Sequence, residues 1–582
     1  MDAILDEITL SRRRKKLDEM TKGEDLGDAY TGTLSRIQAQ PESRSKLGMA
    51  VLMWVSHAER PLHVDELCHA LGVEGSTDLD IRNIPAIETL LACSLGLVMV
   101  EKSSSTVRLV HYTLREYLSN NTNFFPNPHP TIAEVCLTYL NFSHVRSFSP
   151  ASHSVPPTAP FVEYASCYWG THARLETTDG VKTLALKLLD GYDKHISSKI
   201  LLLHSVRDEE QPLGGDSTPT GFTGLHGAAY FGCLDLTVAL LETNKGDVQA
   251  TDFHGNNAIA WASKRGNEEV VRALLEWSEA HSDARGSKYG SAPLLWAAEN
   301  GHEGVVRILL ERKDVNPGKP DKNGRTPLSW ASGGGHEGVV RMLLERSDVN
   351  PDKTNKFCRT PLSFASQSGR QGVVRILLER NDVNPDKPDL CSRAPLWWAS
   401  LNGHERVVRL LLERNDINPN KRDLLGATPL SWASDRGHEG VVRMLLERND
   451  VNLNKRDFLG DTPLCSASDN GHEGVVRLLL EQNDINPNKR NFLGETPLSS
   501  ASYYGHEGVV RALLGRNDVN PNKADLFGLT PLSEAARNGH EGVVKMLRER
   551  NDTNPYKPDR RRRTLRWWTS RCPADTPQPQ SR

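Results

Sequence analysis

A segment of 34 residues recurs along the second half of the chain. Its clearest copy, Gly324–Asn350, reads GRTPLSWASGGGHEGVVRMLLERSDVN. Successive prolines of the Thr-Pro-Leu or Ala-Pro-Leu motif, from Pro293 to Pro531, are 34 residues apart, and two weaker units around Gly224 and Ala258 precede them. A fixed period of this length is typical of a stacked solenoid, in which each unit buries its apolar face only against its neighbours. We therefore predict ten stacked units over residues 222–554.

Each unit predicts two short helices joined by a tight turn. Thr326 is a favourable N-cap, and Pro327 fits the first position of a helix. Gly335 is suited to end that helix, because glycine readily adopts the left-handed conformation found after a last turn. A second, amphipathic helix is expected over residues 337–346. The proline that follows it then predicts an extended turn leading to the next unit.

The motif T-P-L-x-x-A-x-x-G-H-x-x-V-V-x-x-L-L resembles the ankyrin repeat. The resemblance implies stacked helix pairs with projecting turns beside a concave surface, and it implies a protein partner on that surface. The chain departs from the pattern in two ways: the usual histidine after T-P-L is kept only as His226, and the usual Gly-Ala-Asp turn is replaced by Asn-Asp-Val-Asn-Pro. The turn geometry is therefore not implied by the resemblance.

Composition excludes several classes of protein. The 582 residues carry a formal charge of −3, which argues against a general polyanion binder. The nine cysteines form no C-x-x-C pair, which favours a reducing compartment, so we predict the cytoplasm, with the nucleus as the alternative. No secretory signal is recognisable, and no apolar run approaches the ~20 residues that span a bilayer. We expect no membrane partner.

The chain before the repeats predicts further segments. Apolar stripes predict helices around residues 47–55, 64–71 and 86–93, and two short apolar runs, Leu95–Glu101 and Val107–Val110, predict a β-hairpin. Three helices and a hairpin indicate a winged helix. The predicted segments are a helical lead-in (1–44), a winged-helix domain (45–125), a helical extension (126–205) that caps the solenoid, a linker (206–221) and, after the repeats, a basic disordered tail (555–582).

The motifs GEDLGDAYTGTLSRIQ, SHAERPLHVDELCHAL and VRLVHYTLREYLS resemble the segment that follows the NACHT nucleotide-binding domain in fungal NLR-like proteins. That segment carries the label of a GPI inositol-deacylase winged helix. The resemblance implies the regulatory or sensing part of such a system, or alternatively the C-terminal portion of a NACHT signalling NTPase. The chain contains neither the serine elbow G-x-S-x-G nor the phosphate loop G-x-x-x-x-G-K-[ST]. We predict no enzymatic activity and no cofactor.

A winged helix also suggests DNA binding, but its charge argues against it. Between Val64 and Glu101 the only Lys or Arg is Arg82, among seven acidic residues, and phosphate neutralisation supplies most non-specific affinity. We therefore expect no nucleic-acid partner. The basic clusters Arg12–Lys16 and Arg560–Arg563 are most simply solvated, with nuclear import and a nuclear regulatory cofactor as the alternative.

Two recurring polar patterns have structural explanations. A histidine opens most second helices, as at His336 and His472. Neighbouring layers lie ~8–10 Å apart, whereas zinc ligands lie ~2.0–2.1 Å from one ion. The histidines therefore predict a hydrogen bond across the turn between the helices rather than a metal site. Glu and Arg recur four residues apart on the second helices, which predicts a solvated outer face.

The candidate partner-binding residues are aromatic and aliphatic side chains that recur by unit. The turn tips carry Leu425, Phe458, Leu459, Phe492, Leu493 and Phe527 among other apolar residues. They predict either an exposed stripe that binds a partner or tips that pack against the next turn. The first helices carry Trp330, Trp398 and Trp432 at the same repeat position. These tryptophans are predicted either to pack in the core or on the inner face, or to contact a partner protein. Tyr503 and Tyr504 occupy positions that vary between units and are predicted to set specificity.

Overall fold

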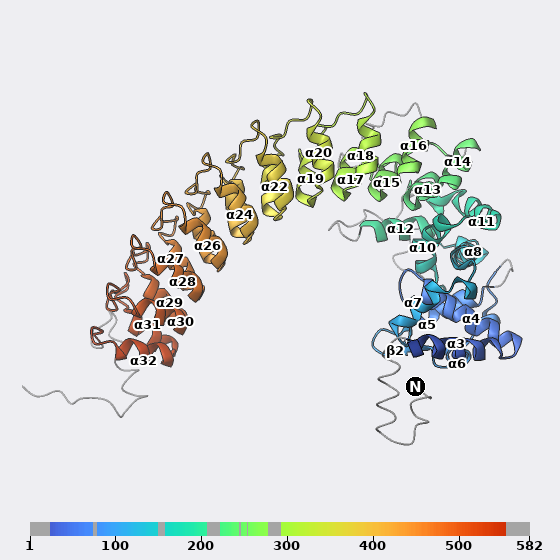
Figure 1. Ribbon diagram of the computed structural model, residues 1–582, viewed down its shortest axis with the longest axis horizontal. Helices are drawn as coiled ribbons and strands as arrows, with labels where there is room; N and C mark the ends of the chain where they lie inside the picture. The colour runs from blue at the N-terminus through green and yellow to red at the C-terminus, as the bar shows by residue number, and fades with distance from the viewer. Residues whose placement is uncertain are drawn as a thin grey trace, which may run out of the picture. The chain divides into compact units, whose positions relative to one another are not determined.

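The computed structural model describes residues 24–73, 78–148, 157–206, 221–243, 246–252, 254–277 and 293–554 (Figure 1). The chain forms two compact units: residues 1–293 with 311–315, and residues 294–310 with 316–582. The fold class is mostly α, as predicted. The basic clusters Arg12–Lys16 and Arg560–Arg563, most of the linker and the tail lie outside the described residues. The segment boundaries stay predictions.

The first unit begins with the predicted winged helix. The helix α3 (Glu24–Gln38) lies in the predicted lead-in. The elements that follow are α4 (Glu42–His57), β1 (Leu62–His63), α5 (Val64–Leu71), α6 (Ile87–Cys93), β2 (Val98–Glu101), β3 (Thr106–Leu109) and α7 (Tyr112–Asn120). The hairpin pairs Val98 with Leu109. A third antiparallel strand, β1, pairs with β3 and completes the order β1-β3-β2. Two residues are too few to show an alternating pattern, so sequence reasoning missed β1.

Five further helices form the helical extension, with the four-residue α9 among them. They are α8 (Pro128–Leu140), α9 (Ser143–Arg146), α10 (Val162–Leu175), α11 (Asp179–Leu189) and α12 (Ile196–Val206). α8 begins at Pro128, because proline is tolerated in the first turn of a helix. Tyr139, Tyr164 and Trp169 are fully buried, and the ring of Tyr164 packs edge-on against Trp54 of α4 at 6.0 Å between centroids.

The extension packs on the first repeat, as predicted. The first two helix pairs, α13 (Gly224–Phe231) with α14 (Leu234–Glu242) and α15 (Ala258–Arg265) with α16 (Glu268–Trp277), belong to the first unit. The ring centroids of Trp169 and Phe231 lie 4.9 Å apart. A Cβ on Gly170 would come within 2.1 Å of the Phe231 ring, so α10 approaches α13 as closely as only glycine permits.

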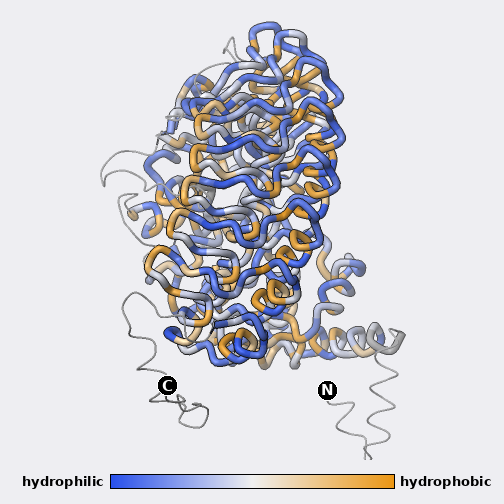
Figure 2. Tube along the Cα trace, turned by 90° about the vertical axis from the view of Figure 1, so that its left-hand side faces the viewer, coloured by the Kyte–Doolittle hydropathy of each residue, from blue (hydrophilic) through white to orange (hydrophobic). Residues whose placement is uncertain are grey.

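The second unit is a row of eight helix pairs. They are α17 (Pro293–Asn300), α18 (Glu303–Leu310), α19 (Pro327–Gly334), α20 (Glu337–Leu344), α21 (Pro361–Gln367), α22 (Gln371–Leu378), α23 (Pro395–Leu401), α24 (Glu405–Leu412), α25 (Pro429–Asp435), α26 (Glu439–Leu446), α27 (Pro463–Asp469), α28 (Glu473–Leu480), α29 (Pro497–Tyr504), α30 (Glu507–Leu514), α31 (Pro531–Asn538) and α32 (Glu541–Glu549). Hydrophobic and hydrophilic segments alternate regularly along the repeats (Figure 2).

The helix boundaries follow the predicted signals. The hydroxyl of Thr326 accepts a hydrogen bond from the backbone N–H of Ser329 at 3.2 Å, which caps α19. Gly335 ends the helix with a φ of 88°. On α20, Val339, Val340 and Leu343 are fully buried against the neighbouring layers. Burial of each such side chain contributes about 1.5–3 kcal/mol relative to exposure.

In the repeat Gly324–Asn350, the second helix ends at Leu344, two residues before the predicted end at Arg346. Arg346 instead forms part of the turn. Its guanidinium donates to the carboxylate of Asp348 at 2.9 Å and to the Leu310 carbonyl of the preceding unit at 3.3 Å. The same bonds recur at Arg380, Arg414, Arg448, Arg516 and Arg550. These bonds explain how the Asn-Asp-Val-Asn-Pro turn connects successive layers.

The recurring histidines form a hydrogen bond, as predicted, but the bond runs to the preceding unit and not across the turn within their own unit. The Nε2 of His472 donates to the Asp435 carbonyl of the preceding unit at 2.9 Å, and the bond recurs at His336, His404, His438, His506 and His540. Because a carbonyl only accepts, Nε2 carries the proton. Each imidazole therefore joins two layers through one nitrogen.

Candidate partner-binding surface

Ten apolar side chains at the turn tips are exposed, and we call them the tip stripe. They are Phe357, Leu390, Leu424, Leu425, Phe458, Leu459, Phe492, Leu493, Leu526 and Phe527. Their exposed fractions lie between 50% and 69%. The alternative of tips covered by the next turn therefore does not describe these side chains. That a partner occupies the stripe stays a prediction.

Backbone hydrogen bonds hold the tips in a row. The N–H of Phe458 donates to the carbonyl of Leu425 at 2.8 Å, and the N–H of Phe492 donates to Leu459 at 3.0 Å. The same bond joins Leu390 to Phe357, Leu424 to Cys391 and Leu526 to Leu493. Within one turn, the Asp423 carboxylate accepts from the N–H groups of Leu425 and Ala427, both at 2.9 Å. The apolar side chains therefore project from a fixed backbone edge.

Aspartates at the turn bases hold the predicted tryptophan row. The indole N–H of Trp330 donates to Asp321 at 3.1 Å, and that of Trp432 donates to Asp423 at 2.8 Å. Both tryptophans are half-buried. Trp398 is only 7% exposed. The prediction of a partner contact at Trp398 is therefore corrected, because its surface is already covered inside the array.

Sequence reasoning missed an alternating row of arginines and aromatic rings. Arg325 stacks over Trp330 at 3.4 Å and over Phe364 at 4.4 Å, and Arg359 stacks at 4.3 Å over both Phe364 and Trp398. Arg393 continues the row over Trp398 at 4.4 Å. The signal in the sequence is an arginine directly before the Thr-Pro-Leu or Ala-Pro-Leu motif. It occurs in three successive repeats. Burial lowers the pKa of Arg359 to about 10, although the Asp389 carboxylate opposes the shift.

We expect Arg359→Ala to lower the free energy of unfolding by about 2 kcal/mol, because two desolvated cation–π contacts are lost. Arg359→Met should cost less, since a long apolar side chain fills the same space without a buried charge. Chemical denaturation of the full chain measures both values. The exposed Arg375, changed to alanine, serves as the control and should stay within about 0.5 kcal/mol. Equal effects at the two arginines would show that the stacked row contributes nothing.

Carboxylates occupy the same inner face further along the array. Asp461 and Glu495 stand at the repeat position that Arg325 and Arg359 occupy in earlier units. Burial, followed by neighbouring carboxylates, raises the pKa of Asp469 to about 7. Burial and Asp525 raise the pKa of Glu534 to about 7 as well. Along the second compact unit, the side chains of the inner face thus change from arginines and aromatic rings to carboxylates.

The predicted tyrosines lie beside these carboxylates. Tyr503 and Tyr504 are 46% and 55% exposed, and their ring centroids lie 4.9 Å apart in an edge-to-face arrangement. Burial and then the charge of Asp469 raise the pKa of Tyr504. Both rings therefore present aromatic surface next to an acidic face.

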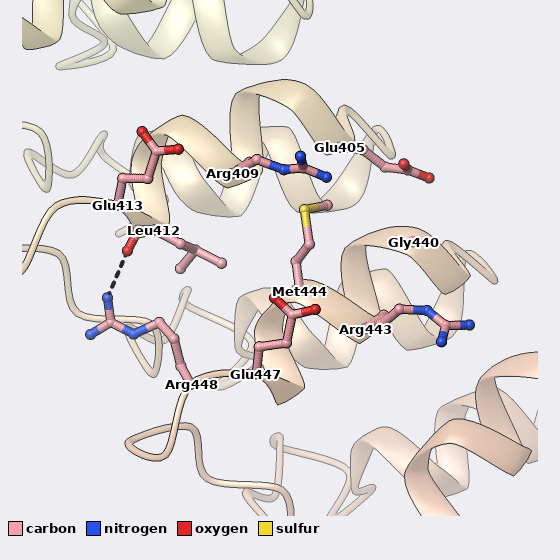
Figure 3. Close-up of a pocket in the computed structure, with 9 residues that line it drawn as sticks. All are labelled: Glu405, Arg409, Leu412, Glu413, Gly440, Arg443, Met444, Glu447 and Arg448. Atoms are coloured by element: carbon pink, nitrogen blue, oxygen red, sulfur yellow. Dashed lines mark hydrogen bonds between the residues drawn. The ribbon is translucent and has the colours of Figure 1, made fainter.

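The outer face carries a shallow groove of about 620 Å³ between α24 and α26 (Figure 3). Its walls alternate in charge through Glu405, Arg409, Arg443 and Glu447, and Arg448 donates to the Leu412 carbonyl at 3.1 Å. The mixture of positive and negative side chains agrees with the predicted solvated face. It favours neither an anionic nor a cationic ligand. Sequence reasoning assigned no site there, and we assign none.

A family model of ankyrin repeats in three copies matches six overlapping stretches between residues 225 and 559. The protein belongs to the ankyrin-repeat family. A second model, described as the GPI inositol-deacylase winged helix domain, matches residues 36–124. No curated protein matches the chain.

Ankyrin repeats support a role in protein interaction. The second match covers only the winged helix domain, so its name is no evidence that this chain catalyses a deacylase reaction. Among the described residues, no group of three or more His, Cys, Asp or Glu side chains is arranged to hold a metal ion. None of the described helices is long and apolar enough to cross a membrane.

Between Val64 and Glu101, the winged helix of this ankyrin protein carries a single Lys or Arg, Arg82. Helix α6 has Glu88 in the first turn and no basic residue in its last turn. The guanidinium of Arg82 is paired with Asp80 at 2.8 Å. Phosphate contacts need available cationic groups, and the expectation of no nucleic-acid partner stays a prediction.

A histidine cluster in the first unit was not predicted. Nδ1 of His129 lies 2.9 Å from Nδ1 of His172, whose Nε2 lies 3.1 Å from the Tyr164 hydroxyl. The ring centroids of His57 and His129 lie 5.7 Å apart. The three histidines come from α4, α8 and α10, so the cluster joins the winged helix to the extension. Burial lowers the pKa of all three.

Proposed function

We propose that this chain is a non-catalytic scaffold whose tip stripe and adjoining inner face bind a partner protein. The observation that carries the proposal is the row of ten exposed apolar side chains on one hydrogen-bonded backbone edge. Contiguous exposed apolar surface marks interaction sites in soluble proteins. A preordered edge also lowers the entropy cost of binding, because the protein side needs no further ordering.

We further propose that the scaffold is the regulatory or sensing part of a fungal NLR-like signalling system in the cytoplasm. The order of a winged helix before an ankyrin array supports this proposal, as do the N-terminal motifs. The alternative is the C-terminal portion of a NACHT signalling NTPase. A nucleotide-binding reading frame joined upstream in the transcript would favour that alternative.

The test compares partner capture by the full chain and by a tip variant. The variant carries Leu425→Ser, Phe458→Ser, Phe492→Ser and Phe527→Ser. Each removed side chain contributes ~1.5–3 kcal/mol when buried in a partner, so affinity should fall at least roughly tenfold. Because all four side chains are exposed, the melting temperature should not change.

A matched control replaces exposed glutamates of the outer face with serine, at Glu345, Glu379, Glu413 and Glu447. The control should retain the partner with unchanged affinity. If the tip variant binds the partner as tightly as the parent, the tip stripe is not the binding surface and the proposal is wrong.

A further inference from the structure

Three arginines of successive repeats stack on shared aromatic rings, and we call them the arginine row. They are Arg325, Arg359 and Arg393. The guanidinium carbon of Arg325 lies 4.4 Å from the ring centroid of Phe364, and that of Arg359 lies 4.3 Å from the same centroid. Trp398 is shared in the same way by Arg359 at 4.3 Å and Arg393 at 4.4 Å. These distances join three positive charges into one row over α19, α21 and α23.

The arginine row keeps hydrogen-bond donors that nothing uses. The Nε atoms of Arg325 and Arg359 are buried without a partner. Nη2 of Arg359 donates to Gln367, and Nε of Arg393 donates to Asp389 at 2.9 Å. The other terminal nitrogens of the row are not buried, and no described residue accepts a hydrogen bond from them. These donors therefore remain available to an acceptor that approaches from solvent.

The charges of the arginine row also act on one another. Burial lowers the pKa of Arg359 to about 10, and the charges of Arg393 and Arg325 add to that shift, although Asp389 opposes it. Asp321 and Glu299 oppose the shift at Arg325, but burial outweighs both and lowers its pKa. An anion bound beside these groups would stabilise their charged forms.

The fold of the repeat does not require an arginine at this position. The equivalent residues of later repeats are Ala427, Asp461, Glu495 and Leu529. Those repeats form the same pairs of helices, from α25 to α32. The array is therefore built equally well without the arginines, and perturbed charged groups of this kind are concentrated at functional sites.

We propose that the arginine row binds an acidic segment of the partner protein, rich in aspartate or glutamate. A guanidinium presents a planar fork of donors that matches the two oxygens of a carboxylate. Packed helices of neighbouring layers lie ~8–10 Å apart, and alternate side chains of an extended segment lie ~6.6 Å apart. Flexible glutamate side chains span the difference. The inference rests on the proposed scaffold function and names the chemistry of the partner segment.

Single-stranded nucleic acid is the competing class of ligand, because phosphates also suit guanidinium groups. Its bases bind by stacking on exposed aromatic rings. Phe364 and Trp398 are each only 7% exposed, and guanidinium groups already stack on both. The row thus offers donors but little free ring surface, which favours carboxylates over a chain of bases.

The test measures binding of a short fluorescent glutamate–glycine peptide to the full chain by anisotropy. The parent should bind this peptide at least roughly tenfold more tightly than the glutamine–glycine counterpart. The row variant, Arg325→Met with Arg359→Met, should bind the glutamate peptide at least roughly tenfold more weakly, since methionine packs on the rings but donates no hydrogen bond. Arg393 is kept, because it neutralises the buried Asp389. Equal binding of the two peptides by the parent overturns the proposal.

A control variant makes the same charge change on exposed arginines of the second helices in the same two repeats, with Arg341→Met and Arg375→Met. It should bind the glutamate peptide within about twofold of the parent. Equal weakening in the row and control variants means that only net charge matters and overturns the proposal.

Arg325→Met alone replaces the row variant if the latter melts at a lower temperature than the parent. No described residue accepts a hydrogen bond from the Arg325 guanidinium, so its removal leaves no acceptor unpaired. This single variant should still bind the glutamate peptide at least roughly threefold more weakly. An unchanged affinity contradicts the proposal.

A fluorescent single-stranded oligonucleotide with the same net charge as the glutamate peptide tests the competing class. The parent should bind it more weakly than the peptide. Tighter binding of the oligonucleotide, lost in the row variant, would assign the arginine row to nucleic acid and overturn the proposal.

The tip variant separates this inference from the proposed function. If the partner protein is lost by the tip variant but retained by the row variant, the scaffold proposal stands and the inference about the arginine row is wrong. If the glutamate peptide binds the tip variant normally while no partner depends on the tips, the arginine row stands as a binding site and the scaffold proposal fails.

Discussion

Acidification from about pH 7 to pH 5 is expected to destabilise the first unit by about 4 kcal/mol, half of it from His172 and half from His195. Burial, together with the charges of His129 and His57, lowers the pKa of His172 to about 3. Burial lowers that of His195 to about 4, although its bond to the Leu140 carbonyl opposes the shift. Both pKa values lie below the ordinary histidine pKa of 6.5. Below about pH 6.5 the unfolded chain therefore binds more protons than the folded chain. The free energy of unfolding falls as the pH is lowered.

Urea unfolding of the full chain and of a His172→Gln variant, followed by tryptophan fluorescence at several pH values, measures this effect. Glutamine keeps a polar side chain but cannot become charged. The variant should therefore lose about half of the pH dependence, or about 2 kcal/mol. The difference between the two proteins cancels the carboxylates that titrate elsewhere. Parallel pH profiles for parent and variant would contradict the buried, neutral state of His172.

Trp169→Ala is expected to lower the free energy of unfolding by about 3–5 kcal/mol, the range for a large aromatic core residue. Trp169 is fully buried, and its ring contacts Phe231 of the first repeat at 4.9 Å. The change leaves a cavity at the joint where α10 covers α13. Gly170, at the same joint, already brings the two helices too close for a Cβ. The helices are therefore held in position and cannot easily collapse into the space.

Trp277 provides the control, since it is 55% exposed at the end of α16. Trp277→Ala should change stability by no more than about 0.5 kcal/mol. Chemical denaturation compares both variants with the parent, and hydrogen exchange of α13 amides shows whether the joint has loosened. Equal stability of the two variants would mean that the extension does not support the first repeat.

Local signals predicted the repeat unit because they act within a few residues. The Thr326 cap, the proline at the first helical position and the left-handed Gly335 each determine the backbone near themselves. Apolar spacing likewise identified α5 over Val64–Leu71 and the hairpin of β2 and β3. The second helix ended early because Arg346 bonds to a carbonyl of the preceding layer, which no local signal encodes.

The candidate surface was only partly predictable. The tip stripe was visible as apolar pairs in polar turns, but its exposure depends on how one turn stacks on the next. Trp398 belongs to the same sequence row as Trp330 and Trp432, yet its neighbours bury it between Arg359 and Arg393.

The sequence by itself determined the 34-residue period, the two helices of each unit and the winged helix before them, since caps, glycines and apolar spacing are local. Only the tertiary structure decided which side chains meet across layers. Stacking brings residues 34 positions apart into contact, as with Arg325 and Arg359 around Phe364, and folding joins His57, His129 and His172 from three helices. Burial and mutual charge, which set the pKa of Asp469 and of His172, arise only when those distant segments pack together.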